Sequence, residues 1–199
     1  MLTFGAIVPV LAAGMAIADV DGRYIRNLDP GIDGGTGNLI VEVFVAPDRR
    51  VEGCRIIYST LPEAGRQRVC EQARKMAAST VATDADGNPV YGFVTLARIM
   101  RSGPSAARFE DLLPADLNIS VEDIPGRDTR KTVQVTVLVA SNGEVASCQP
   151  PARPDRNYGE VACEQLAGES FPIAYDRDGT AVRYVKLITA EFIEDSRDS

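Results

Sequence analysis

The sequence contains no histidine and no tryptophan, and aromatic residues make up only 6% of its 199 positions. Without histidine, the chain cannot build a Ser–His or Cys–His catalytic pair or a zinc site with histidine ligands. Basic residues are also in the minority, with 21 Lys and Arg against 28 Asp and Glu, a net charge of −7. We therefore expect neither nucleic acid nor an anionic membrane surface as a partner, because both require a basic face.

What remains is typical of a folded protein. Hydrophobic residues make up 45% of the chain and charged residues 25%, enough for one large domain or two small ones. Residues 2–18 carry no charge, and Ala16-Ile17-Ala18 follows the small-x-small pattern of a cleavage site. We predict a signal peptide over 1–18, although no Lys or Arg precedes it. The alternatives are a buried first helix or an uncleaved inner-membrane anchor over residues 2–18.

Two copies of one pattern follow each other along the chain. The matched blocks are Val41–Ala46 with Val135–Ala140, Cys54 with Cys148, Cys70-Glu71-Gln72 with Cys163-Glu164-Gln165, and Asp84-x-Asp86-Gly87 with Asp176-x-Asp178-Gly179. Their order is kept, and the spacing drifts only from 94 residues (41 to 135) to 92 (84 to 176). Repetition at such a spacing predicts a duplicated structural unit.

Each copy predicts a strand, a second strand, a helix and a last strand. Alternating valines, as in Val133–Val139, indicate a half-buried strand, and Asn142-Gly143 is a strong hairpin signal. The fold class expected is α+β, with two tandem small β-β-α-β units over 38–100 and 131–193, each an antiparallel sheet packed on one helix. Outside them we expect a lead-in over 19–37, a linker over 101–130 and a polar tail over 194–199.

All four cysteines lie inside the repeated blocks. We predict disulfides Cys54–Cys70 and Cys148–Cys163, because in each unit the first cysteine lies on a strand and the second on the helix that covers it. A bridge that closes about 15 residues contributes roughly 3 kcal/mol in the chain-entropy model. Zinc binding and a nucleophilic cysteine are the alternatives, but the chain has no Cys-x-x-Cys pair and no histidine.

The Asp-x-Asp-Gly blocks resemble the second half of a calcium loop. The first ligand position of such a loop would fall on Ala82 and on Ala174, and neither side chain can coordinate a cation. We therefore predict a glycine-containing turn before a strand, with no metal and no cofactor. An acid hydrolase that uses Asp84 and Asp86 is the enzymatic alternative, but we expect a binding protein rather than an enzyme.

The order of these features resembles the C-terminal domain of TonB-type energy transducers, in its variant with a cysteine pair. Phe171-Pro172-Ile173-Ala174-Tyr175-Asp176-Arg177-Asp178-Gly179 carries the clearest likeness. The first copy has Ser79-Thr80-Val81 in place of the Phe-Pro element, and the chain lacks the long proline-rich spacer of the family. The resemblance implies a periplasmic, non-enzymatic protein, held at the inner membrane if residues 2–18 are not cleaved.

The resemblance also implies a binding mode. Family members bind an extended peptide of an outer-membrane transporter by adding it to a sheet edge, so the partners expected are envelope proteins in TonB-dependent transport. The edges expected are the last strands, Phe93 to Met100 and Val185 to Phe192, with contacts from Phe93, Thr95, Ala97, Val185, Leu187, Thr189 and Glu191. The alternatives are that the other copy or the linker covers these edges, and that the protein is an envelope scaffold without a peptide ligand.

Overall fold

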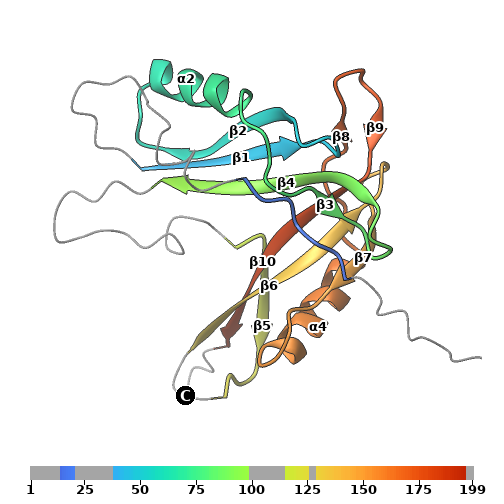
Figure 1. Cartoon of the computed structure of the whole chain (residues 1–199). Helices are drawn as coiled ribbons and strands as arrows, with labels where there is room; N and C mark the ends of the chain where they lie inside the picture. The colour runs from blue at the N-terminus through green and yellow to red at the C-terminus, as the bar shows by residue number, and fades with distance from the viewer. Residues whose placement is uncertain (1–13, 21–37, 99–114, 126–128, 196–199) are drawn as a thin grey trace, which may run out of the picture.

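The computed structural model describes residues 14–20, 38–98, 115–125 and 129–195 (Figure 1). The expectations for 1–13, 21–37, 99–114, 126–128 and 196–199 lie outside the described residues. The elements are β1 (Leu39–Val45), β2 (Val51–Ser59), α2 (Glu63–Ala73), β3 (Ala82–Thr83), β4 (Pro89–Arg98), β5 (Leu117–Val121), β6 (Arg130–Val139), β7 (Val145–Gln149), α4 (Arg156–Leu166), β8 (Ala174–Tyr175), β9 (Ala181–Val182) and β10 (Tyr184–Glu194).

One mixed sheet of eight strands organises the fold. Its order is β2-β1-β4-β10-β6-β7, with β3 paired to β4 and β5 paired to β10, while β8 and β9 form a separate hairpin. The pairs β4–β10 and β5–β10 are parallel, and the other pairs of the sheet are antiparallel. The α+β class is therefore confirmed. The expectation of two tandem units, each with its own antiparallel sheet, is not confirmed, because the parallel pair of β4 and β10 joins both sets of strands into one sheet.

The joint between the two halves is short. Tyr184 pairs with Tyr91 and Val185 with Gly92, and the two strands then diverge (Figure 1). β1 lies between β2 and β4 and is buried at all seven positions, rather than on alternate positions as its valines suggest. A strand in this central position has side chains covered on both faces, so burial does not alternate along it.

The two helices lie on opposite faces of this sheet. Val43 of β1 packs in the same core as Val69 of α2, whereas its neighbour Phe44 points to the other face and packs in the core that contains Leu166 of α4. Successive side chains of a strand point to opposite faces, so these memberships place α2 and α4 on different sides. Each helix is bridged to the strand beneath it by one of the two disulfides.

The two cores exchange side chains across the joint. Leu138 and Val185 come from the second half of the sequence, but they are buried in the core beneath α2. Phe44 comes from the first half and is buried in the core beneath α4. Each half therefore completes the apolar packing of the other.

The predicted linker contains a strand. Leu117–Val121 runs parallel to Ala190–Glu194 and extends the sheet beside β10. The Asp116 N–H donates to the carbonyl of Thr189 at 2.9 Å, which starts this pairing. The expectation of an irregular linker over 101–130 is thus corrected for its second part, because an extended segment satisfies the open N–H and C=O groups of β10.

Gly14 to Val20 forms an extended segment beside β3. Ala16 and Thr83 exchange two backbone hydrogen bonds, of 3.1 and 2.9 Å, in antiparallel fashion. Met15, Ala18 and Val20 are buried in the core beneath α2. These residues are not helical, so the alternative of a buried first helix is corrected here, and the predicted cleavage site lies within this extended segment. Among the described residues, no helix combines the length and the apolar character needed to cross a bilayer.

Candidate functional site

Both predicted disulfides are confirmed. Cys54 of β2 is bonded to Cys70 of α2 with a Cα–Cα distance of 5.4 Å. Cys148 of β7 is bonded to Cys163 of α4 with a Cα–Cα distance of 5.5 Å. Bonded cysteines are neither metal ligands nor nucleophiles, and the described residues contain no cluster of three or more acidic or cysteine side chains suited to a metal ion.

The two Asp-x-Asp-Gly blocks form turns, as predicted. Asp84 accepts backbone N–H groups from Asp86 at 3.1 Å and from Asn88 at 2.9 Å. Asp176 repeats this arrangement with Asp178 and Thr180. The glycines Gly87 and Gly179 have φ of 82° and 79°, a conformation that side chains other than glycine rarely adopt.

Asp84 is the more strongly held of the two turn carboxylates. It is 3% exposed, and Arg183 of the second half lies 2.9 Å from it. The N–H of Asn88 is the main cause that lowers the pKa of Asp84 below its ordinary 3.8; burial opposes this effect, and Arg183 supports it. The carboxylate thus serves the turn and the contact between the halves.

We predict that Asp84→Asn lowers the free energy of unfolding more than Asp176→Asn does at pH 7. The amide keeps the size of the side chain but loses the charge that faces Arg183. Folding lowers the pKa of Asp84, so the charged carboxylate adds to the free energy of unfolding of the wild type. This difference from Asp84→Asn is present above pH 3.8 and disappears as the pH falls through the pKa of the folded state. Urea unfolding of both variants at several pH values checks this. An equal loss in both variants at pH 7 would contradict it.

The last strands predicted as edges are each paired along one side. Phe93, Thr95 and Ala97 pair along β4 with Phe44, Glu42 and Ile40 of β1. Val185 pairs with Gly92 and Leu138, and Glu191 pairs with Asn118 and Thr132, so at these two positions β10 is covered on both sides. The other side of β4 pairs with β10 only at Tyr91 and Gly92, and beyond Gly92 no strand of the described residues pairs with it there.

A gap remains where β4 and β10 diverge. Within the described residues, no strand pairs with this side of β10 between Val185 and Ala190. A hollow of about 250 Å³ occupies the gap and is lined by Phe93, Thr95, Leu187 and Thr189, four of the seven residues predicted for peptide contact. Ala97, Val185 and Glu191 do not line it.

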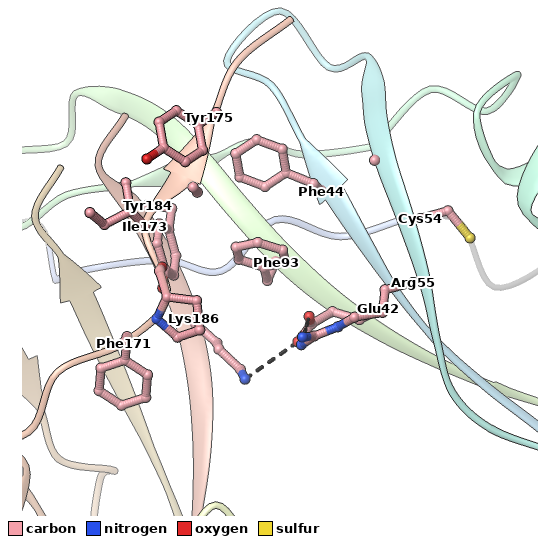
Figure 2. Close-up of a pocket in the computed structure, with 13 residues that line it drawn as sticks. Glu42, Phe44, Cys54, Arg55, Phe93, Phe171, Ile173, Tyr175, Tyr184 and Lys186 are labelled. Carbon is pink, nitrogen blue, oxygen red and sulfur yellow. Dashed lines mark hydrogen bonds and ion pairs between the residues drawn. The ribbon is translucent and has the colours of Figure 1, made fainter. Parts of the chain in front are cut away.

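A cavity of about 280 Å³ opens beside this gap, and we call it the aromatic cleft. It is lined by Glu42, Phe44, Gly53, Cys54, Arg55, Phe93, Phe171, Pro172, Ile173, Ala174, Tyr175, Tyr184 and Lys186 (Figure 2). Its floor is the face of β1, β2 and β4 that is turned away from α2, and one wall is the segment that ends in β8. The volume lies near the lower end of those of small-molecule pockets, which suits one or two side chains.

The floor of the cleft is a stack of rings. The ring centre of Phe44 lies 4.7 Å from that of Phe93 and 4.9 Å from that of Tyr91. The rings of Phe93 and Tyr184 pack edge to face, with their centres 4.9 Å apart. The hydroxyl of Tyr184 donates to the carbonyl of Pro172 at 2.9 Å. Burial raises the pKa of Tyr184 to about 12, so this hydroxyl stays protonated at neutral pH.

The opposite end of the cleft is charged. Glu42 is 4% exposed and lies 2.6 Å from Arg55 and 3.4 Å from Lys186. Lys186 also lies 3.5 Å from Asp116. Figure 2 shows the Arg55 and Lys186 side chains reaching toward Glu42 from two different strands. Two cations therefore meet at one buried carboxylate, and Arg55 remains 61% exposed to solvent.

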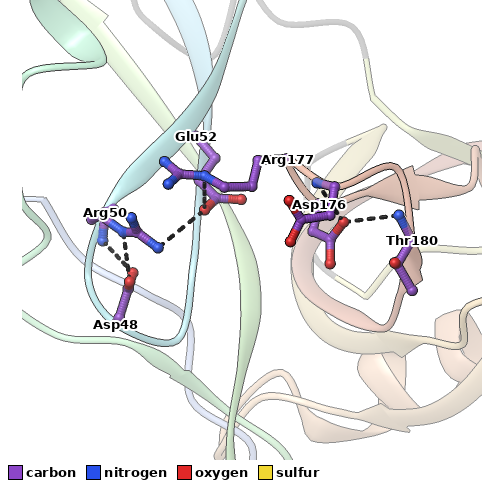
Figure 3. Close-up of polar contacts among 7 residues, drawn as sticks. Asp48, Arg50, Glu52, Asp176, Arg177 and Thr180 are labelled. Carbon is purple, nitrogen blue, oxygen red and sulfur yellow. Dashed lines mark hydrogen bonds and ion pairs between the residues drawn. The ribbon is translucent and has the colours of Figure 1, made fainter.

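A second ion cluster holds the wall of the cleft. Arg177, in the turn between β8 and β9, lies 3.4 Å from Glu52 of β2, which also faces Arg50 at 3.7 Å (Figure 3). One oxygen of Glu52 is buried without a hydrogen-bond partner among the described residues. The hairpin of the second half is thus attached to the sheet of the first.

Of the residues that line this cleft, sequence reasoning predicted only Phe93 as a contact residue, and it singled out Phe171–Tyr175 only as part of a resemblance. The signal was available in part, because Glu42 interrupts an apolar strand and Lys186 interrupts the apolar stretch from Tyr184 to Ile188. A charge among buried residues requires a partner. That Glu42 and Lys186 pair with each other depends on the joint between β4 and β10. Apolar walls beside two cations can bind an apolar side chain next to an anionic or carbonyl group. The chain matches no family model, no curated protein and no solved structure.

Proposed function

We propose that the chain is an exported, non-enzymatic, TonB-like protein that binds envelope partners by adding an extended peptide to a strand edge. The observation that carries this proposal is Gly14–Val20, an extended segment that lies against β3 as an added strand. The proposal therefore takes residues 14–18 to be retained in the exported protein rather than removed by the predicted cleavage. Main-chain hydrogen bonds at Ala16 and Asp19 hold it there, and apolar side chains anchor it. The fold therefore offers a place for an extended peptide, which is the binding mode that the TonB-type resemblance implies.

The proposal includes two tandem units that arose by duplication. In the first half Ala82 pairs with Val90, and in the second Ala174 pairs with Val182, which preserves the offset of 92 residues. The equivalent disulfides support the same reading. Disulfides persist in oxidising compartments, and this supports a periplasmic location.

Within this proposal, the partner binds at the unpaired outer side of β8 and at the gap beside Leu187, rather than along the whole of the last strands. The reason is that β10 is already paired on both sides at Val185 and from Ala190 onward. A role in TonB-dependent transport, with an outer-membrane transporter as the partner, follows from the resemblance alone.

The second candidate is an envelope scaffold without a peptide ligand. The observation that favours it is the extensive pairing of β10, which has β6 along one edge and β4 and β5 along much of the other. A sheet covered in this way is suited to rigidity as well as to binding.

The two candidates predict different results in one experiment. The full chain is expressed in a Gram-negative host, purified from the periplasm and analysed by intact mass. It should weigh four hydrogens less than its reduced form, because two bridges are present. Envelope proteins captured on it are then divided into overlapping synthetic peptides. Under the proposal, a short extended segment of one captured protein binds on its own.

The alternatives give clear contrary results. If an envelope protein is captured but none of its synthetic peptides binds on its own, the scaffold is favoured. Four free thiols in protein recovered from the cytoplasm would contradict export and the envelope partners together.

A further inference from the structure

The segment Gly14–Val20 lies in a groove formed by both halves. Its Met15 N–H donates to the side-chain oxygen of Gln149 at 2.6 Å, and the Ser147 hydroxyl lies 3.3 Å from the Met15 sulfur. Ala16 then pairs with Thr83 of β3. The groove thus combines the outer side of β3 in the first half with β7 in the second.

The repeat assigns an equivalent position to each wall of this groove. With the offset of 92 residues, Thr83 corresponds to Tyr175 of β8. With the offset of 94, Gln149 corresponds to Arg55 of β2, and Ser147 likewise corresponds to Gly53. Tyr175, Arg55 and Gly53 all line the aromatic cleft. The cleft is therefore the counterpart, with the halves exchanged, of the groove that Gly14–Val20 fills.

The backbone of Tyr175 is free to accept an added strand. The Asp176 N–H donates to Thr180 inside the hairpin at 3.0 Å, as the Asp84 N–H does to Asn88 in the first half. Hydrogen-bonding groups alternate in direction along a strand, so the N–H and C=O of Tyr175 point away from β9, as those of Thr83 do toward Ala16. Among the described residues, no strand pairs with this outer side.

The surface beside this backbone is apolar and open. The side chain of Tyr175 is 58% exposed and that of Ile173 is 41% exposed, and both line the cleft. Large apolar side chains that gather at a hollow mark an interaction surface more often than single exposed ones do.

Two differences between the grooves define the chemistry of the occupant. Gln149 accepts the N–H of Met15, but Arg55 can only donate, so a peptide must present an oxygen there. In the groove that holds Gly14–Val20, Thr80 exchanges two backbone hydrogen bonds with Asp19. The equivalent residue in the cleft is Pro172, which has no N–H and whose carbonyl already accepts the hydroxyl of Tyr184. The cleft therefore offers one backbone pairing position, an aromatic floor and a cationic end.

We propose that the aromatic cleft binds an extended peptide of a partner protein, antiparallel to β8, with an acidic side chain at Arg55 and apolar residues on the floor. The residue that follows the acid pairs with Tyr175 through its backbone, as Ala16 pairs with Thr83. Lys186 is already paired with Glu42 and Asp116, whereas the side chain of Arg55 is 61% exposed and can bind the carboxylate of the peptide beside Glu42. This inference rests on the proposed function, for which it names the site and the kind of peptide.

The test uses the full chain and a defined peptide. The probe is Gly-Glu-Ala-Ile-Ala-Asp-Val, which is the sequence of residues 14–20 with glutamate in place of methionine, and its matched control has glutamine at that position. We expect amide chemical shifts to change at Ile173, Tyr175 and Arg55 when the probe is added. The glutamate peptide should bind about threefold more tightly than the glutamine peptide, and Arg55→Gln should abolish this preference.

Two variants at one exposed position separate the backbone from the side chain. Tyr175→Ala keeps the outward N–H, whereas Tyr175→Pro removes it without removing a bond of the hairpin. We expect Tyr175→Pro to weaken binding about fivefold more than Tyr175→Ala does, since one main-chain hydrogen bond is lost. Equal affinity in the two variants would overturn strand addition at β8.

The remaining outcomes distinguish this inference from the proposed function. Shifts confined to Ala16, Thr83 and Gln149 would mean that the probe replaces the segment of the chain in the other groove. That result would overturn the cleft assignment and leave peptide addition standing. No shift anywhere at millimolar peptide would overturn the cleft assignment, and the capture experiment with envelope proteins decides the proposed function separately.

Discussion

Replacing Cys54 and Cys70 by alanine should lower the free energy of unfolding by about 3 kcal/mol, and replacing Cys148 and Cys163 should have a similar effect. Each bridge closes a loop of nearly the same length, with sequence separations of 16 and 15. Without the bridge, the unfolded chain gains conformational freedom that the folded state lacks. Each bridge also fastens a helix of only eleven residues to the sheet, and a helix of that length is marginal in water on its own.

Urea unfolding of the two double variants and of the wild type measures this effect. The reduced wild type is the matched control, because it loses both bridges without a change of side chain. Its free energy of unfolding should fall by about the sum of the decreases in the two double variants, if the two loops act independently. A loss below about 0.5 kcal/mol in either double variant would contradict a stabilising role for that bridge.

Shortening Ile188 to alanine should destabilise both halves of the protein by about 2–5 kcal/mol. Ile188 is fully buried in β10, where it pairs with Val135 of β6. The variant removes apolar contacts and leaves a cavity beneath α4. Because β4 pairs with β10 and the cores exchange Phe44 and Val185, loosening the second half should also release the first.

Amide hydrogen exchange at Val43 in β1 and at Val135 in β6 checks this coupling. Both amides should exchange faster in Ile188→Ala, by similar factors. Ile57→Ala, at a side chain that is 38% exposed, is the control and should change neither strongly. Faster exchange at Val135 alone would mean that the two halves unfold independently, as two tandem domains would.

The local features of this protein follow from its sequence alone. The cysteine spacing predicts both disulfides, because a strand and the helix that covers it bring two cysteines together within one unit. The Asp-x-Asp-Gly blocks predict the turns at Asp84 and Asp176, since those hydrogen bonds form between residues two and four positions apart. Such features depend on neighbours in sequence, and a pattern records them directly.

The role of each strand could not be deduced in this way. The alternating pattern around Leu187 is compatible with an edge strand and with an interior strand, because alternation reports which face is buried and not which neighbour pairs. β10 is paired on both sides at Val185 and from Ala190 onward, but between them, where Leu187 lies, only β6 pairs with it. The linker residues Leu117–Val121 alternate apolar and polar side chains, a strand signal that the linker prediction overlooked, and β10 provides the partner with which they pair.

The sequence by itself determined the repeat and the α+β class, and it determined the two bridges and the turns because these rest on contacts between residues at most 16 positions apart. Only the tertiary structure decided that the two copies share one sheet, that α2 and α4 cover opposite faces, and that Glu42 meets Lys186. The aromatic cleft belongs to this second group, because its floor and one wall come from different copies. Pairing between distant strands is selected by the burial of whole faces, and no local pattern in either copy encodes it.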